Sequence, residues 1–229
     1  MPTPAEAPAC TLLSWSGGKD SALALQALRA DPGARVDGLL TTVTDVYDRV
    51  SMHGVRRTLL ERQAAAAGLP LNVVRIPPAC GNAEYEARFG GALAGWAGRG
   101  GEAVAFGDLF LADIRAYRER LVAEHAPGLA ARFPVWGADT AALAHRFVAD
   151  GFRAVLVCVD PRQIDASFCG REYDGSLLAE LPPGADPCGE HGEFHTFVYD
   201  GPVFGAPVAV ARGEVVTRDG FVFCDLLPG

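Results

Sequence analysis

No C-x-x-C motif occurs in this chain of 229 residues, although it contains six cysteines. A chain of this length can bury a sizeable core without covalent cross-links. We therefore expect reduced thiols instead of a disulfide framework, as is typical of cytoplasmic proteins. The scattered cysteines are Cys10, Cys80, Cys158, Cys169, Cys188 and Cys224.

Long apolar runs and basic runs are also missing. No apolar segment reaches the length that spans a membrane, and residues 1–10 lack the basic and apolar regions of a signal peptide. The formal net charge is -8, which disfavours a nucleic-acid substrate because contacts to a phosphate backbone depend on basic patches. We expect a cytoplasmic protein that has neither a membrane nor a nucleic acid as its partner.

The Walker A motif G-x-x-x-x-G-K-[ST] is absent as well, but another glycine-rich segment follows the first predicted strand. Residues 11–13 are apolar, residues 16–21 read S-G-G-K-D-S, and an Ala/Leu-rich helix follows. Adjacent glycines permit a tight turn and the close approach of a ligand, and the first N–H groups of a helix attract anions. A serine-capped turn without a ligand is the alternative. The complete hexapeptide in this context favours nucleotide phosphates.

Several side chains near this loop are candidates for binding ATP and Mg²⁺. Asp20 would be repelled by phosphates unless a metal ion bridges them, so we expect Mg²⁺. Asp108 follows a buried strand, where it could hold the same ion or cap a helix. His53 precedes a helix and could equally be a capping or packing residue, and the Lys19 side chain could lie in solvent. The candidate nucleotide-binding residues are Ser14, Ser16, Gly17, Gly18, Lys19, Asp20, Ser21, His53, Gly107 and Asp108.

Apolar runs and helical patterns alternate along the first two thirds of the chain. Five or six strands are expected, with 132–135 and 152–159 as the last two, and this alternation predicts a parallel sheet flanked by helices. Such sheets bind ligands at the carboxyl ends of their strands, where the Ser16 loop lies. Short alternating runs among prolines and glycines then predict a small β-rich unit. We expect an α/β fold with domains at 10–160 and 161–229, although proline-rich loops can also belong to one domain.

A second chemically rich segment, residues 186–196, reads D-P-C-G-E-H-G-E-F-H-T. If residues 193–199 form a strand, Glu193 and His195 share one of its faces. A carboxylate and an imidazole on one face can exchange protons near neutral pH. The neighbouring glycines would let the loop that carries Glu190 fold tightly. A solvated hairpin loop is the alternative, but this composition favours a functional role.

The same segment also permits a metal site. Cys188, His191 and His195 have the spacing C-x2-H-x3-H. Structural zinc normally takes four ligands, and no fourth ligand is obvious nearby. Zinc is therefore the weaker interpretation of these three residues.

Seven segments together resemble the diphthine–ammonia ligase family of ATP pyrophosphatases, and the resemblance covers nearly the whole chain from Leu12. The first and the last segment are the specific ones, and the others support them. The segments are S-G-G-K-D-S from Ser16, M-H-G-V from Met52, F-G-D-L from Phe106, D-I-R-x-Y-R-E from Asp113, F-P-V-W-G from Phe133, G-R-E-Y-D from Gly170 and C-G-E-H-G-E-F-H-T-F-V-Y-D-G-P from Cys188.

The resemblance implies an adenine nucleotide alpha hydrolase-like domain and a C-terminal domain that recognises a substrate. It also implies a reaction in which ATP activates a carboxylate, AMP and pyrophosphate are released, and ammonia forms an amide. The loop would hold the pyrophosphate, and Asp20 and Asp108 would hold Mg²⁺. With Asp20, the catalytic candidates are Glu190, Glu193 and His195, which would bind the acceptor or guide ammonia.

One departure concerns the acceptor. Diphthamide-making members resemble G-E-x-G-E-F-E-T, whereas this chain has His195 in place of the last glutamate. This looks like the bacterial branch, for which a role in cobalamin salvage has been proposed. The acceptor, small or protein-borne, and the nitrogen source stay open, and a homodimer is one option for the oligomeric state.

Two rival functions follow from the same loop. Sulfur transfer or another tRNA modification would need an activated cysteine and a basic surface, and the sequence shows neither. A nucleotide sensor without catalysis would not require Asp20 in the loop. We therefore expect an AMP-forming ligase.

Overall fold

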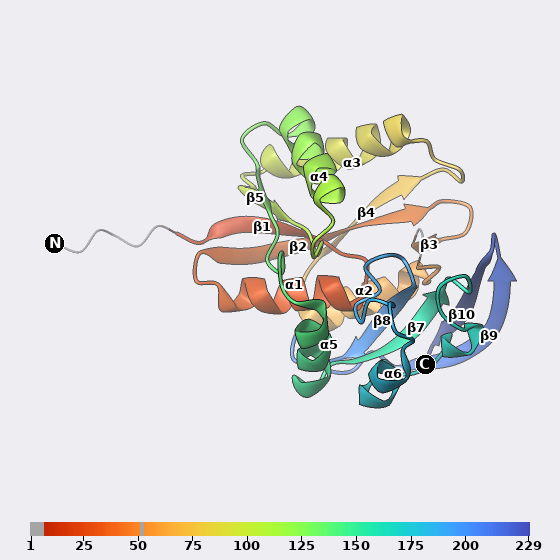
Figure 1. The fold of residues 1–229 in the computed structure, drawn as a ribbon. Helices are drawn as coiled ribbons and strands as arrows, with labels where there is room; N and C mark the ends of the chain where they lie inside the picture. Colours follow the sequence, from red (N-terminus) through yellow and green to blue (C-terminus); the bar gives the residue numbers. More distant parts are fainter. Residues whose placement is uncertain (1–6, 51–52) are drawn as a thin grey trace.

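The computed structural model describes residues 7–50 and 53–229. Residues 1–6, at the start of the Pro/Ala-rich segment, and Met52 of the M-H-G-V motif lie outside the described residues. The fold is α/β, as predicted (Figure 1): a mostly parallel sheet is flanked by helices, and a separate antiparallel sheet is formed by the later part of the chain.

Within the described residues, the first sheet has six strands in the order β3-β2-β1-β5-β6, with β4 beside β2. The central strand is buried on both faces, as parallel strands usually are, because Leu12 and Leu13 point into two different apolar cores. The parallel strands are β1 (Ala9–Ser14), β2 (Ala34–Thr44), β4 (Leu71–Ile76), β5 (Ala103–Ala105) and β6 (Ala130–Arg132), and β3 (Arg49–Val50) is antiparallel to β2.

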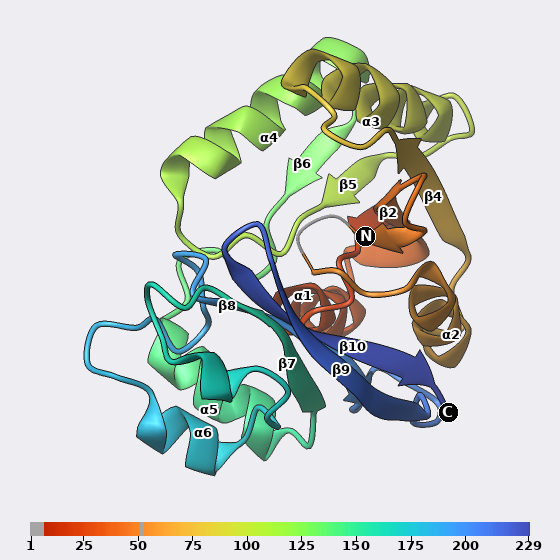
Figure 2. The same cartoon turned by 90° about the vertical axis from the view of Figure 1, so that its right-hand side faces the viewer.

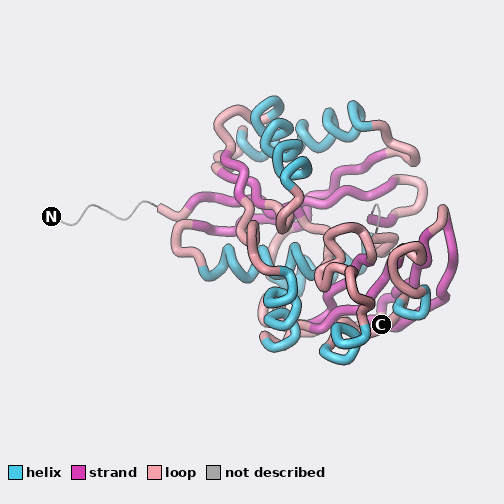
Figure 3. The backbone as a smooth tube through the Cα atoms, in the orientation of Figure 1, coloured by secondary structure: helices cyan, strands magenta, loops and turns pink. Residues whose placement is uncertain are grey.

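Helices cover both faces of the first sheet (Figures 1 and 3). The helices α3 (Asn82–Ala97) and α4 (Ala112–His125) lie on one face, and α1 (Lys19–Ala30) and α2 (Arg57–Ala67) lie on the other. As the sequence predicts, α2 ends at a glycine, Gly68, whose φ of 68° is left-handed. None of the helices in the described part of the chain is long and apolar enough to cross a membrane.

The second sheet has the strand order β8-β7-β10-β9, and its neighbouring strands are antiparallel. The helices α1 and α2 contact this sheet as well as the first one, so they lie between the two (Figure 2). One apolar core therefore contains residues of both sheets. The strands are β7 (Arg153–Val159), β8 (Phe194–Asp200), β9 (Val210–Arg218) and β10 (Phe221–Pro228), and the accompanying helices are α5 (Thr140–Ala149), η1 (Ala166–Phe168) and α6 (Gly175–Glu180).

A tight turn joins β9 to β10. Asp219 and Gly220 both have positive φ, 51° and 83°, which is the backbone that a two-residue Asp-Gly hairpin requires. The turn pairs Arg218 with Phe221 and sets the register of the whole hairpin. Residues 210–211 and 215–217 belong to one strand, β9.

The structure differs from two sequence expectations. The strand expected at 132–135 is β6 and ends at Arg132, three residues earlier. The strand expected at 152–159 forms as β7, but it pairs with β8 and β10 in the second sheet. A continuous apolar run has the same pattern in either kind of sheet when both faces are buried. The domain boundary at residue 160 stays a prediction.

Candidate active site

The loop between β1 and α1 has the conformation that its glycines allow. Gly17 has a φ of +81°, and a Cβ there would lie 2.7 Å from Gln63 Oε1 and from Leu60 Cδ1. Another residue would therefore be both strained and obstructed. Gly18 begins α1 without a side-chain cap. Instead, Thr196 of β8 accepts a hydrogen bond from the Lys19 N–H at 3.0 Å.

Two further contacts attach the loop to its surroundings. The Gly17 carbonyl accepts hydrogen bonds from the Val198 N–H at 2.9 Å and from Gln63 Nε2 at 3.0 Å. Trp15 Nε1 in turn donates to Gln63 Oε1 at 2.9 Å. The loop is thus held by α2 on one side and by the second sheet on the other, so both halves of the fold position it.

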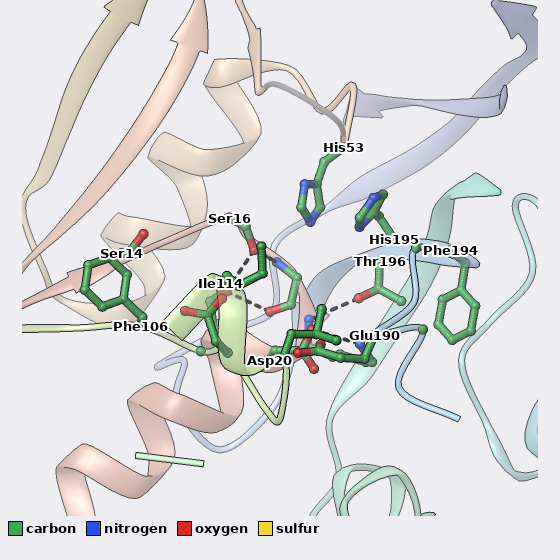
Figure 4. Close-up of a pocket in the computed structure, with 18 of the residues that line it drawn as sticks. Ser14, Ser16, Asp20, His53, Phe106, Ile114, Glu190, Phe194, His195 and Thr196 are labelled. Carbon is green, nitrogen blue, oxygen red and sulfur yellow. Dashed lines mark hydrogen bonds and ion pairs between the residues drawn. The ribbon is translucent and has the colours of Figure 1, made fainter. Parts of the chain in front are cut away.

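A cleft of about 300 Å³ opens beside this loop (Figure 4). It lies at the carboxyl end of β1, between the start of α1, the segment from β5 to α4, and the start of β8. Of the predicted site residues, the following line it: Ser14, Ser16, Gly18, Lys19, Asp20, Ser21, His53, Gly107, Asp108, Glu190 and His195. The sequence analysis did not select Phe106, Leu111, Ile114, Arg118, Gly189, Gly192, Phe194 and Thr196, which also line it.

The hydroxyl groups of the loop are organised by the start of α1. Ser21 Oγ donates to the Gly18 carbonyl at 2.8 Å, and Ser16 Oγ lies 3.4 Å from Ser21 Oγ. The Gly18 N–H donates to Ser16 Oγ at 3.3 Å. Both hydroxyls therefore face the cleft, where they can contact an anion.

Two carboxylates lie at the bottom of the cleft with unused oxygens. In the described part of the chain, Oδ1 of Asp20 and Oδ2 of Asp108 are buried and have no hydrogen-bond partner. Burial raises the pKa of both groups, and the negative charge of Asp20 raises the pKa of Asp108 further. Buried acceptors without donors are unfavourable unless a ligand completes them. These oxygens fit a hard cation.

A glycine brings the two acids together. A Cβ on Gly107 would lie 2.9 Å from the carbonyl carbon of Asp20 and 3.1 Å from the Ser21 nitrogen. The segment after β5 can therefore approach the start of α1 only because residue 107 has no side chain. Asp108 is consequently placed beside Asp20, as the common sheet edge predicts.

Lys19 is the cation of the loop, and the alternative of a solvated side chain is wrong. Its side chain is 4% exposed, and Nζ lies 2.9 Å from Asp20 Oδ2 and over the Phe194 ring. Burial opposes its charge, but Asp20 and nearby acids outweigh burial and raise the pKa of Lys19. The backbone N–H of Lys19 donates to Thr196. The group that Lys19 directs at the cleft is therefore its side chain and not its N–H.

Glu193 does not line the cleft, and the expected shared face with His195 is wrong. The strand begins at Phe194, so the alternation of a strand does not extend to Glu193. Its buried carboxylate accepts hydrogen bonds from the N–H groups of Asp186 at 2.7 Å and His191 at 3.0 Å. Glu193 thereby closes the loop of residues 186–193.

The closed loop presents Glu190 to the cleft. Gly189 and Gly192 have φ values of 66° and 83°, which permit the tight fold that the sequence predicts. Oε1 of Glu190 accepts a hydrogen bond from the Leu109 N–H at 3.0 Å. Burial raises the pKa of Glu190 although this hydrogen bond opposes the shift. Glu190 therefore adds a third acid beside Asp20 and Asp108.

The rings of His53 and His195 lie side by side at the opposite wall (Figure 4), with centroids 4.5 Å apart. Burial, and then the neighbouring His53 and Lys19, lower the pKa of His195 well below its usual value. The environment of His195 therefore favours the neutral imidazole, which has a free lone pair for a hydrogen bond or a proton but is a weaker base than an exposed histidine.

Zinc has no site here. In the part of the chain that the structure describes, no group of three or more His, Cys, Asp or Glu side chains could hold a metal ion. Cys188 Sγ donates to the Thr140 carbonyl at 3.4 Å, whereas His195 stacks on His53. Mg²⁺ differs, because one or two carboxylates suffice when phosphates and waters complete its shell.

Arg118 is the residue of greatest consequence that the sequence analysis missed. Its Nε is buried, makes no hydrogen bond to any described residue, and lies 3.6 Å from Asp108 Oδ2. The guanidinium lies over the Phe106 ring. Ile114 and Arg118 both line the cleft and are four residues apart on α4, so this helical spacing, which puts them on one face of the helix, was the signal that could have identified both.

Two protein-family models match the chain. The model described as diphthamide synthase N-terminal domain matches residues 10–126. The model described as diphthamide synthase C-terminal domain matches residues 139–226. The first match contains the loop, Asp108 and Arg118, and the second contains Glu190 and His195. A search of the curated proteins found no match.

Proposed function

Because the chain belongs to the diphthamide synthase family, we propose that it is an AMP-forming amide ligase. Membership indicates an enzyme of the diphthamide synthase type, which uses ATP. One observation carries the finer proposal: two buried carboxylate oxygens, on Asp20 and Asp108, accept no hydrogen bond from any described residue and lie beside a glycine-rich loop and the cations of Lys19 and Arg118. This arrangement is suited to a polyphosphate with a divalent metal ion.

The proposed reaction has two steps. An oxygen of the acceptor carboxylate attacks the α-phosphorus of ATP, the bond from that phosphorus to the β-phosphate oxygen breaks, and pyrophosphate leaves. Ammonia then attacks the carbonyl carbon of the acyl adenylate, the bond to AMP breaks, and a proton is lost. The products are an amide, AMP, pyrophosphate and a proton.

The loop and its neighbours would hold the leaving pyrophosphate. The hydroxyls of Ser16 and Ser21 face the cleft, and Lys19 Nζ offers a positive charge that its raised pKa maintains. The Arg118 guanidinium can bind phosphate oxygens with two parallel donors. Charges placed before the reaction stabilise the charge that develops on pyrophosphate.

Asp20 and Asp108 fit Mg²⁺, because each has a buried oxygen without a hydrogen-bond partner in the described structure. The ion neutralises phosphate charge and orients the phosphates when bound. Lys19 Nζ would then neutralise the other carboxylate oxygen of Asp20, Oδ2. The metal ion and the lysine would thus each use one oxygen of the same carboxylate.

The opposite wall would serve the nitrogen nucleophile. Neutral His195 can accept the proton that ammonia loses when it attacks. Glu190 projects from the closed loop and can attract an ammonium ion. Glu193 acts differently, as a positioning residue that keeps the loop and Glu190 in place.

Sulfur transfer is disfavoured by the state of the thiols. Cys188 is the buried cysteine of the loop 186–193, and burial raises the pKa of its thiol to about 12. A sulfur-carrying cysteine needs a lowered pKa to be a thiolate. The cytoplasmic location and the homodimer stay predictions.

The products distinguish the proposal from its rivals. The protein, Mg²⁺, ATP and ammonium should be incubated with a panel of carboxylic acids, and the nucleotides should be separated. We expect AMP and pyrophosphate in equal amounts, dependent on the acid. Formation of ADP and phosphate would contradict the proposal, and tight ATP binding without turnover for any acid would favour a sensor.

A further inference from the structure

A second pocket, of about 430 Å³, lies next to the cleft and has His53 as a common wall. It is enclosed by the turn between β2 and β3 on one side and by the β9–β10 hairpin on the other. The turn after β3 packs on the hairpin, because a Cβ on Gly54 would lie 3.0 Å from Phe223 Cδ1. A molecule in this pocket would therefore reach the cleft past His53.

One half of the second pocket is apolar. Phe223 and Val216 are directly opposite each other in the hairpin, and the Phe221 ring lies 6.5 Å from that of Phe223. The cysteine thiols at its floor, Cys158 and Cys224, are buried. These surfaces suit an apolar body, because burying apolar groups is favourable in proportion to the area covered.

The half nearer His53 contains a guanidinium, that of Arg49, which lines the pocket, while Arg56 lies behind it on the same carboxylate. Arg49 Nη1 donates to the Gly54 carbonyl and to Asp225 Oδ1, each at 2.7 Å. Arg56 Nη2 also binds Asp225, at 2.6 Å. The guanidiniums of Arg49 and Arg56 thus share the carboxylate of Asp225, whose single negative charge balances one of their two positive charges. The other charged residues of this pocket, Glu214, Arg218 and Asp219, are exposed at its outer rim.

In the first cleft the cations Lys19 and Arg118 lie beside three acids, Asp20, Asp108 and Glu190. These acids would repel a further anion that no metal ion holds. A carboxylate substrate therefore needs a cation on its path of entry. Arg49 supplies one beside His53.

We propose that the second pocket binds the acid that the ligase activates, namely a carboxylate with an apolar body. The body would lie against Phe223 and Val216, and the carboxylate would lie at Arg49 and His53, where it faces the cleft. This inference rests on the proposed function, since it assigns the acceptor site of the same reaction. It places the nucleotide and the acceptor on opposite sides of His53.

A pair of variants on one strand tests this assignment. Val216 lines the pocket, whereas its neighbour Val215 does not line it and is 56% exposed. V216W should fill the pocket, and V215W is the matched control. The probe is 3-(4-fluorophenyl)propionate, followed by its fluorine NMR line during titration with protein. We expect V216W to weaken binding of the probe at least about tenfold and V215W to leave it unchanged.

Two further measurements keep the test decisive. The variant R49Q should weaken binding of the acid about tenfold but leave the corresponding neutral amide unaffected. ATP binding, measured by equilibrium dialysis, should be equal in both tryptophan variants. Probe binding that V216W and R49Q do not alter would overturn the inference, as would displacement of the probe by AMP. Failure of the proposed function would look different, because ATP would then give no AMP while the acid still bound.

Discussion

At the scale of single residues, the two aspartates of the cleft illustrate how function and stability conflict. Asp20 and Asp108 bury oxygens that no donor of the described chain satisfies, and burial raises the pKa of both. Such groups destabilise a folded protein unless they are paired. We propose that a ligand completes them, since no hydrogen-bond donor of the described residues does so.

Asp108 offers a test of the proposed metal site. Asp108→Asn removes a metal ligand, so turnover of ATP should fall about a hundredfold, and it leaves the buried Arg118 guanidinium, 3.6 Å away, without its carboxylate, so the melting temperature should fall as well. The control is Asp113→Asn, an exposed residue of the following helix α4, which should change neither. A loss of stability without a loss of activity would contradict the assignment.

Arg118 can be examined by a graded series. Arg118→Lys keeps the charge but loses the planar pair of donors, so we expect kcat to fall about tenfold, and about a hundredfold in Arg118→Gln. Arg115→Gln is the control, because Arg115 pairs with Glu119 and does not line the cleft. Steady-state release of pyrophosphate measures all three. Equal activity of Arg118→Lys and the unaltered protein would mean that the donor geometry is unimportant, and equal activity of Arg118→Gln and the unaltered protein would contradict a role for Arg118.

At the scale of elements, the loop of residues 186–193 and the β9–β10 hairpin show what a sequence can reveal. Glycine positions predicted a tightly folded loop, and Asp219-Gly220 marks the hairpin turn. Glu193 was misjudged because the alternation of a strand was extended one residue past its beginning.

The same substitution, glutamate to glutamine, should have different effects at Glu190 and at Glu193. Glu193→Gln places an amide against two N–H donors, so we expect the free energy of unfolding to fall by about 1–3 kcal/mol. Glu190→Gln should reduce amide formation with little loss of stability, since its carboxylate accepts a single hydrogen bond, from Leu109. Thermal melts and product analysis separate the two roles. Equal stability of the two variants would contradict the role given to Glu193.

A salt bridge between elements gives a prediction about pH. Asp225 on β10 is bound by Arg49 of β3 and by Arg56 at the start of α2, and these arginines lower its pKa from 3.8 to about 2 although burial opposes them. A lowered folded-state pKa stabilises the protein above the unfolded value, and this stability is lost as the pH falls through 2. The contribution is about 2 kcal/mol near neutral pH.

Asp225→Asn should remove the part of the pH dependence of stability that this salt bridge causes. Between pH 4 and 2, the stability of the unaltered protein should fall more steeply than that of the variant, which is already less stable at pH 7. Urea unfolding at a series of pH values measures the difference. Parallel curves for both proteins would show that the bridge does not couple β10 to the first sheet.

At the scale of the whole molecule, the site is assembled from two sheets that the sequence places far apart. The segments that carry the site residues could be located from residue patterns. The common edge of the parallel sheet predicted that Asp20 and Asp108 would lie close together. The contacts of Thr196 and Val198 with the loop could not be foreseen, because no local pattern encodes pairing between residues about 180 positions apart. The same reason explains the misplacement of β7.

Thr196 tests whether the second sheet is needed for nucleotide binding. Thr196→Val removes the acceptor of the Lys19 N–H and should weaken ATP binding about fivefold to tenfold, as expected for one buried hydrogen bond. Thr196→Ser keeps the hydroxyl and should bind ATP normally. Calorimetric titration with ATP compares the two. Equal affinities would mean that the first sheet forms the loop unaided.

The central claim is that the Ser16 loop holds the outer phosphates, so that the bond broken lies next to the adenosine-bearing phosphorus. A crystal structure with Mg²⁺ and the α,β-methylene analogue of ATP measures this directly. We expect the β- and γ-phosphates at Ser16, Ser21 and Lys19, and the metal ion between Asp20 and Asp108. Phosphates bound elsewhere, with Gly17 and Gly18 facing solvent, would contradict the account.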